Sequence, residues 1–112
     1  QQSTILNQVF NILNNDDFAY LFGENSKAEV PIVGEIDGKL ISGKIDLLVM
    51  EEKRLIIIDY KTNFHGRNYS DLPANYKNQL MIYKRIMQKI YPDKEIQCAI
   101  IWTDLPKIMF MN

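Results

Sequence analysis

The sequence predicts a small α/β domain in which helices flank a central mixed β-sheet. Segments rich in β-branched residues recur along the chain, and one long amphipathic helix separates the third strand-like segment from the fourth. Strands joined by tight turns must run antiparallel, but a helix between two strands allows them to pair in parallel. The 112 residues suit one small domain.

Composition places the chain among ordinary globular proteins. Hydrophobic residues make up 46% and charged residues 24%, with a formal net charge of −1. A nucleic-acid partner would therefore need a local basic groove, which the net charge neither predicts nor excludes. The single cysteine, Cys98, forms no intrachain disulfide and favours a reduced, cytoplasmic setting. Apolar runs are far shorter than the roughly 20 residues of a membrane helix, so we expect no membrane contact.

The first 27 residues predict a helical lead-in, and residues 28–112 predict the sheet and its long helix. Apolar residues at helical spacing follow a capping Ser3 and indicate a helix over Thr4–Asn14. A second short helix is expected over Asp16–Phe22, where Gly23 ends it.

Three strands follow as a meander. Residues 28–37 alternate like a strand, and Pro31 argues for an edge or irregular position. Asp37 and Gly38 form a strong hairpin signal, after which we expect strands over Leu40–Met50 and Arg54–Thr62.

The second half combines a polar loop, a helix and two strands. The loop covers residues 63–72 and contains Gly66. The helix over Pro73–Tyr91 is stopped by Pro92 and carries an apolar stripe of residues that step by four and three: Tyr76, Leu80, Tyr83, Met87 and Ile90. The last strands are expected over Ile96–Thr103 and Lys107–Met111.

Two aspartates and a lysine interrupt the apolar strands of the central hairpin. If its turn is centred on Glu52 and Lys53, Asp46 lies directly opposite Asp59, with Cβ atoms about 4.5–5.5 Å apart. Such close carboxylates repel each other unless a proton or a cation lies between them. Lys61 follows Asp59 by two residues and therefore points to the same face.

This constellation suits a divalent cation with oxygen ligands, Mg²⁺ or Mn²⁺. The matching chemistry is hydrolysis of a phosphodiester, because the cation lowers the pKa of a coordinated water and stabilises charge on the phosphate. The lysine can orient the attacking water or hold a phosphate oxygen. Alternatively, Asp46 and Asp59 are ordinary strand-end residues and Lys61 pairs with one of them.

Four segments in order resemble a known family. "GKIDLLV", "IIIDYKTN", "YKNQLMIY" and "YPDKEIQCAIIWT" are similar to the nuclease domain of RecB/AddA-type helicase–nucleases, in the PD-(D/E)xK, restriction-endonuclease-like superfamily. "EVPIVGEIDGKLISGKIDLL" resembles the C-terminal end of AddA proteins in particular. The resemblance covers roughly residues 28 to 104 and implies a restriction-endonuclease-like core. It also implies a metal-dependent deoxyribonuclease acting in double-strand break processing and recombinational repair.

The resemblance implies roles for the hairpin residues. Asp46 and Asp59 would bind the metal with the backbone carbonyl of Tyr60, and Lys61 would be the catalytic lysine. Glu29 matches a glutamate common at this place and could sit near the metal, but a surface role on an edge strand fits it equally.

Gln79 and Tyr83 match a Gln-x-x-x-Tyr motif that helps to position DNA or the active-site network. They are four residues apart and therefore share one side of the helix. Core packing is an equal alternative for Tyr83, and an ordinary surface position for Gln79. Lys77, on the polar side of the helix, is a further DNA contact in this interpretation, although a solvated face accounts for it better.

The chain departs from the family at one position. An upstream helical histidine, which supplies another metal ligand, is absent, and the only histidine, His65, lies in the predicted loop. Either the chain is a C-terminal piece of a larger AddA-like helicase that works with an AddB-like subunit, or it is a degenerate relative. The N-terminus without Met favours the first. The rival function is a non-catalytic DNA-binding or subunit-interaction module on a nuclease fold.

Overall fold

The computed structural model describes residues 23–62, 73–104 and 107–111. The two helices expected before Gly23, the loop over residues 63–72 and His65 lie outside these residues. In the part that is described, no helix has the length and apolar character needed to cross a membrane.

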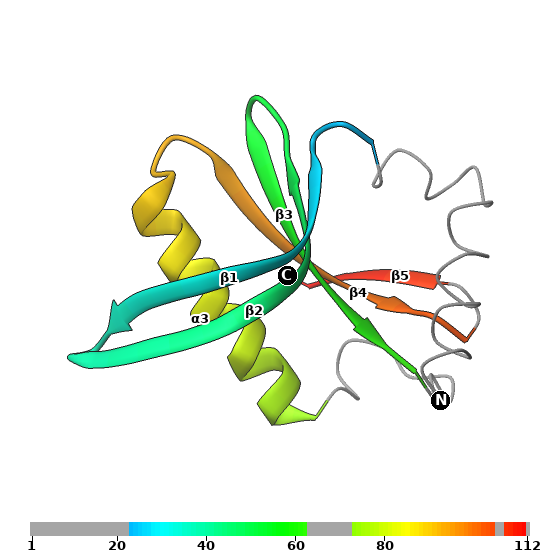
Figure 1. Cartoon of the computed structure of the whole chain (residues 1–112). Coiled ribbons are helices and arrows are strands. Elements are labelled where there is room, and N and C mark those ends of the chain that lie inside the picture. Colours follow the sequence, from blue (N-terminus) through cyan, green and yellow to red (C-terminus); the bar gives the residue numbers. More distant parts are fainter. Residues whose placement is uncertain (1–22, 63–72, 105–106, 112) are drawn as a thin grey trace.

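Five strands form one mixed sheet, as predicted. Their order in the sheet follows the chain, and the elements are β1 (Ser26–Ile36), β2 (Lys39–Met50), β3 (Arg54–Lys61), α3 (Ala74–Ile90), β4 (Glu95–Trp102) and β5 (Lys107–Met111). Among the strands of the described residues, only β3 and β4 pair in parallel, and α3 lies between them in the chain and crosses one face of the sheet (Figure 1). The strand that contains Pro31 lies at an edge, which also agrees with the sequence.

The register of the central hairpin matches its predicted turn. Leu47 pairs with Ile58 and Met50 pairs with Leu55, so the turn is centred on Glu52 and Lys53. The Lys94 ammonium donates to the backbone carbonyls of Glu51 and Glu52, which ties this turn to the segment between α3 and β4. The register on which the Asp46–Asp59 prediction depends is therefore present.

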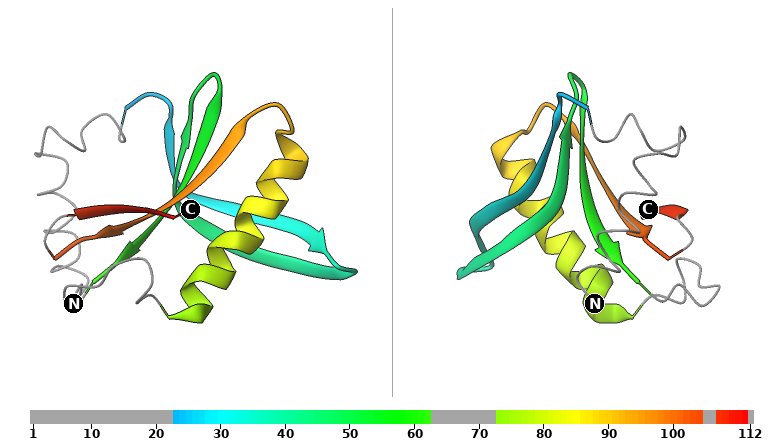
Figure 2. Two further views of the ribbon diagram at one scale, coloured as in Figure 1. Left: turned by 180° about the vertical axis from the view of Figure 1, so that it is seen from behind. Right: turned by 45° about the vertical axis from the view of Figure 1, so that its right-hand side comes forward.

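The sheet buries apolar side chains on both faces. The face toward α3 receives Leu55 and Ile57 from β3, and the opposite face receives Ile56 and Ile58. Since β3 is buried on both sides, its apolar run is nearly continuous, as is typical of a strand with a parallel neighbour. Figure 2 shows α3 against one side of the sheet and the sheet strongly twisted beneath it.

Two glycines let α3 approach the β1–β2 hairpin closely. A Cβ atom on Gly34 would lie 2.8 Å from the Ile86 side chain, and one on Gly43 would overlap the Tyr83 hydroxyl oxygen. Any larger residue at either position would push the helix or its side chains outward. The close approach places the Tyr83 hydroxyl directly over β2.

The alternation of β2 shifts by one residue beside Asp46. Ile45 and Leu48 both belong to the cluster facing α3, although strict alternation would put them on opposite faces. Across the ladder, the pairs Ala28–Leu47 and Val30–Ile45 flank Glu29, which has a left-handed φ of 52°. The backbone is therefore irregular at neighbouring positions of β1 and β2. In β2 this irregularity directs the Asp46 side chain to the α3 face, the face that Leu48 also occupies two residues later.

The left-handed backbone at Glu29 predicts a stabilising substitution. Glu29→Gly should raise the free energy of unfolding by about 0.5–1 kcal/mol, because glycine adopts this φ without steric cost and the exposed ion pair it removes contributes little. Chemical denaturation measures the change. Glu35→Gly, at an exposed position of the same strand whose φ is not positive, is the matched control and should be destabilising. Equal losses for the two variants would contradict the assignment of strain to Glu29.

Candidate active site

The site forms where β3 changes from apolar to charged residues. Asp59 and Lys61 continue the alternation of Leu55 and Ile57, so both side chains lie on the face toward α3. Their side chains are 20% and 23% exposed, respectively, so neither charge is fully solvated. The Lys61 ammonium lies 3.0 Å from Asp59 Oδ2.

The Asp46 side chain connects β2 to β3 beyond the last backbone pair of these two strands. The described pairing of these strands stops at Leu47 and Ile58, and the backbone N–H of Tyr60 donates to Asp46 Oδ2 at 3.0 Å. A hydrogen bond also links the carboxyl groups of Asp46 and Asp59. The structure therefore brings together the two aspartates that the sequence placed opposite each other. It adds a contact from the Tyr60 N–H, whereas the predicted role of the Tyr60 carbonyl stays a prediction.

Burial changes the acidity of two groups here. It raises the pKa of Asp59 from 3.8 to about 6, with a further contribution from the hydrogen bond to Asp46, and Lys61 opposes the shift. Burial also raises the pKa of the Tyr60 phenol to about 12, and the charge of Asp46 adds to this effect. Both shifts follow from negative charge being held in a site that water reaches poorly.

Lys61 is held at both its backbone and its ammonium. The Thr103 N–H and hydroxyl donate to the Lys61 carbonyl at 2.8 Å and 3.3 Å, which anchors the end of β3 to the end of β4. On the side of α3, the Lys61 ammonium lies 4.2 Å from the centroid of the Tyr76 ring. Sequence reasoning missed both contacts. Thr103 is separated from Lys61 by a whole helix, and the spacing of Tyr76 makes it one more member of the apolar stripe.

Gln79 and Tyr83 contact each other on α3, as their spacing implies. The Gln79 amide donates to the Tyr83 hydroxyl at 3.3 Å, and the Tyr83 side chain is buried while Gln79 is exposed. Both line an open groove of about 490 Å³ between α3 and β2. The other residues that line it are Ile41, Ser42, Asn75, Asn78 and Ile82. Tyr83 thus packs in the core, lines the groove and accepts a hydrogen bond from Gln79 through its hydroxyl.

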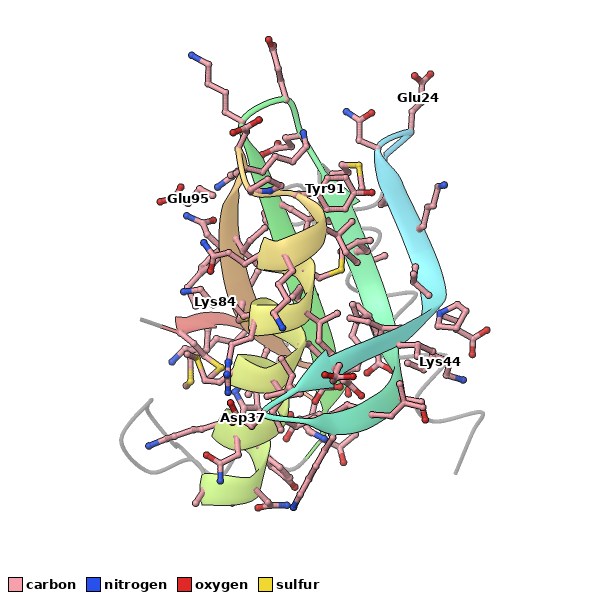
Figure 3. The ribbon with its side chains drawn as sticks, turned by 90° about the vertical axis from the view of Figure 1, so that its left-hand side faces the viewer. Glu24, Asp37, Lys44, Lys84, Tyr91 and Glu95 are labelled. Atoms are coloured by element: carbon pink, nitrogen blue, oxygen red, sulfur yellow. The ribbon has the colours of Figure 1, made fainter. Side chains whose placement is uncertain are left out.

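Glu29 is not brought to the acid pair. Its carboxylate is largely exposed and pairs with Lys44 at 3.4 Å, and Figure 3 shows Lys44 on β2 pointing away from α3. Within the described ranges, no three residues among His, Cys, Asp and Glu lie close enough to hold a metal ion together. Lys77 lies half-buried on α3, and its contact with DNA stays a prediction.

The donor set fits Mg²⁺ or Mn²⁺. Mg²⁺ in proteins is usually held by one or two carboxylates and completes its coordination with waters and substrate phosphates. Asp46 and Asp59 supply two carboxyl groups in contact, and a divalent cation would remove the repulsion between their charged forms. The site therefore offers the kind of ligand that such a cation takes.

A match to a family model identifies the class of proteins to which this fold belongs. The family model of the PD-(D/E)XK nuclease superfamily matches residues 11–107. The chain belongs to this superfamily, so the restriction-endonuclease-like fold expected from the sequence is confirmed.

One relative and one solved structure are also similar to this chain. An ATP-dependent helicase/nuclease from Oenococcus oeni is 30% identical over 66 residues, which are 58% of this chain and 6% of that protein. The crystal structure of SSO0001 superposes with a TM-score of 0.53 over 99% of this chain and 49% of that one, at 22% identity. This second likeness shows the fold alone.

The raised pKa of Asp59 predicts how stability depends on pH. Folded Asp59 holds its proton more tightly than the unfolded carboxyl does, so the free energy of unfolding should fall as pH rises from about 4 to 6 and level off above. The loss is on the order of 2 kcal/mol. Thermal unfolding in chelator-containing buffers measures it.

Asp59→Asn should remove most of this pH dependence, because asparagine does not titrate. The matched control is Asp93→Asn, at an exposed aspartate beyond α3, which should leave the slope unchanged. A wild-type stability that rises over this pH interval would contradict the assigned cause.

Proposed function

We propose that this domain hydrolyses DNA phosphodiester bonds with Mg²⁺ or Mn²⁺ held on Asp46 and Asp59. The observation that carries the proposal is the contact between these two carboxyl groups, with the Lys61 ammonium 3.0 Å from Asp59. Membership of a nuclease superfamily supports the same reaction. The partly buried acid pair is otherwise a costly arrangement for a stable sheet.

Each residue has a distinct task in this mechanism. The Tyr60 N–H fixes one oxygen of Asp46, and Asp59, once ionised, completes the cation site. The cation, when bound, makes water a nucleophile near neutral pH and stabilises charge on the phosphate. Lys61 then directs its ammonium at a phosphate oxygen or the attacking water. Asp59 is largely protonated below pH 6, so cation binding weakens in acid.

The groove beside Gln79 supports a path for the DNA strand. Its lining includes the amides of Asn75, Asn78 and Gln79, together with the apolar side chains of Ile41 and Ile82. Amides can donate to and accept from base edges and sugars, and apolar side chains can pack against base faces. Uncharged contacts of this kind suit an unpaired strand better than a duplex held through its phosphates.

The wider role is proposed from the relative. Because this chain spans 6% of the length of the Oenococcus oeni protein, that protein's helicase activity does not follow from the match. We propose that the domain forms the C-terminal nuclease of a larger AddA-like chain, which works with an AddB-like subunit in double-strand break processing and recombinational repair. The family histidine missing from the described site would come from residues upstream.

A non-catalytic module is the second candidate. In the described residues only two carboxylates meet at the site, and no third acidic or histidine side chain joins them. A domain that had lost a ligand could keep the fold and the groove and bind DNA or a partner protein without cleaving it.

Cleavage of linear DNA separates the two candidates. With Mn²⁺ or Mg²⁺, the wild-type chain should cut single- or double-stranded DNA, and Asp59→Ala should lower the rate by at least about 1,000-fold because the cation site is lost. A gel assay of end-labelled substrates measures this. Asp93→Ala is the matched control and should retain the wild-type rate.

A silent wild-type chain calls for the same assay with the native upstream sequence restored. Continued silence there would overturn the catalytic proposal in favour of a binding module.

The groove generates a separate prediction about affinity. In an Asp59→Asn background that does not cleave, Asn78→Ala and Gln79→Ala should each raise the Kd for a labelled single strand about 5- to 10-fold, since each removes hydrogen bonds to the strand. Fluorescence anisotropy measures the Kd. Gln88→Ala, on an exposed position of the same helix outside the groove, serves as the control. If all three variants bind alike, the strand does not lie in this groove.

A further inference from the structure

The Lys61 ammonium has two partners of different kinds. One is the Asp59 carboxylate at 3.0 Å, and the other is the face of the Tyr76 ring, whose centroid lies 4.2 Å away. These partners come from different elements, β3 and the first turn of α3. A cation over an aromatic face is attracted by the negative charge density of the ring, most strongly where water is scarce.

The two partners respond differently to a divalent cation. A cation held on Asp46 and Asp59 would neutralise the negative charge that keeps Lys61 in the ion pair, and it would repel the ammonium. The Tyr76 ring is neutral, so its attraction for the ammonium does not depend on the state of the acids. A lysine has a long flexible side chain, and without a second partner it would lose a defined direction when the cation binds.

The orientation of the Tyr76 ring is restricted by its surroundings. Its ring packs against the core cluster under α3 and is only partly exposed. Its N–H donates to the Pro73 carbonyl at 3.1 Å, at the start of the helix. A tyrosine has two side-chain torsions, so a ring that is packed on one side keeps its orientation at low entropic cost. Its contact with Lys61 is made by the ring face, so the hydroxyl is not needed for it.

We propose that Tyr76 is a positioning residue for Lys61, holding the ammonium at the site when the acid pair is occupied by a divalent cation. This inference rests on the proposed function, since it assigns the direction of the proposed catalytic lysine. Under this proposal α3 has two roles. Gln79 lines the groove, and Tyr76, about one turn earlier, holds the Lys61 ammonium at the end of β3.

The first test requires no enzymatic activity. In protein with ¹³C-labelled lysine, the Lys61 ε-methylene signal, assigned with Lys61→Arg, should be shifted upfield by the ring, and Tyr76→Leu should remove the shift. The shift should persist when MgCl₂ is added to saturation. Absence of the shift in wild type, or its loss on adding MgCl₂, would overturn the proposal.

The second test is kinetic and uses three variants. Tyr76→Leu should lower kcat about tenfold with little change in KM, and Tyr76→Phe should restore most of kcat because it keeps the ring. Tyr91→Leu is the matched control, since this tyrosine also packs partly buried on the same core cluster, while the ring over the Lys61 ammonium in the described structure is that of Tyr76. A loss of kcat in Tyr91→Leu as large as in Tyr76→Leu, or no rescue by phenylalanine, would overturn the positioning role.

The two tests separate the failure of this inference from the failure of the proposed function. If no form of the chain cleaves DNA, the proposed function fails, and the Lys61 signal with MgCl₂ still decides whether Tyr76 holds the lysine. If the chain cleaves and the signal is insensitive to Tyr76, only the positioning role fails.

Discussion

The partial burial of Asp59 beside Asp46 is the constraint on which the rest of the site depends. Burial raises the pKa of Asp59 to about 6, and the hydrogen bond to the neighbouring Asp46 carboxyl contributes to the same shift. Such a pair persists only on a scaffold that cannot easily relax around it. The strand that carries Asp59 is that scaffold, because its preceding residues are fully buried on both faces and both of its edges are paired.

The same constraint accounts for the irregular backbone opposite Asp46. A regular β2 would turn Asp46 away from the helix, since Ile45 already faces it. The shift in alternation brings the carboxyl to the α3 face, and the left-handed Glu29 on the neighbouring strand accompanies it. Strain of this kind is kept where surrounding structure enforces it, and it occurs often at functional sites. The direction of Asp46 is therefore set by two strands rather than one.

The sequence predicted the features that depend on period and order. The register of the central hairpin followed from its charged turn, and the mixed sheet followed from a helix placed between apolar strands. It could not predict the shift in alternation at Asp46. The residues after Asp46 are apolar on both faces of β2, so the sequence does not show which of them faces α3. Contacts across the crossover were equally hidden: Thr103 reaches the Lys61 carbonyl only because β3 and β4 are parallel neighbours. Tyr76 has the same spacing as the core residues of its helix, so pattern alone assigned it to packing.

Under the proposed function, the Asp59 carboxylate has two alternative positive partners, the Lys61 ammonium and a divalent cation. In the described structure, the positive charge next to the acid pair is the ammonium of Lys61, at 3.0 Å. A divalent cation on the same carboxylates would supply twice that charge, so it would compete with Lys61 for Asp59. Protonation of Asp59 opposes both. A lysine displaced from Asp59 in this way carries an uncompensated positive charge beside the cation, which is the place where a phosphate anion would gain most from it. Under the proposed function, the ion pair in the described structure holds the lysine beside the cation site, and Asp59 must be ionised before either Lys61 or a divalent cation can bind its charge.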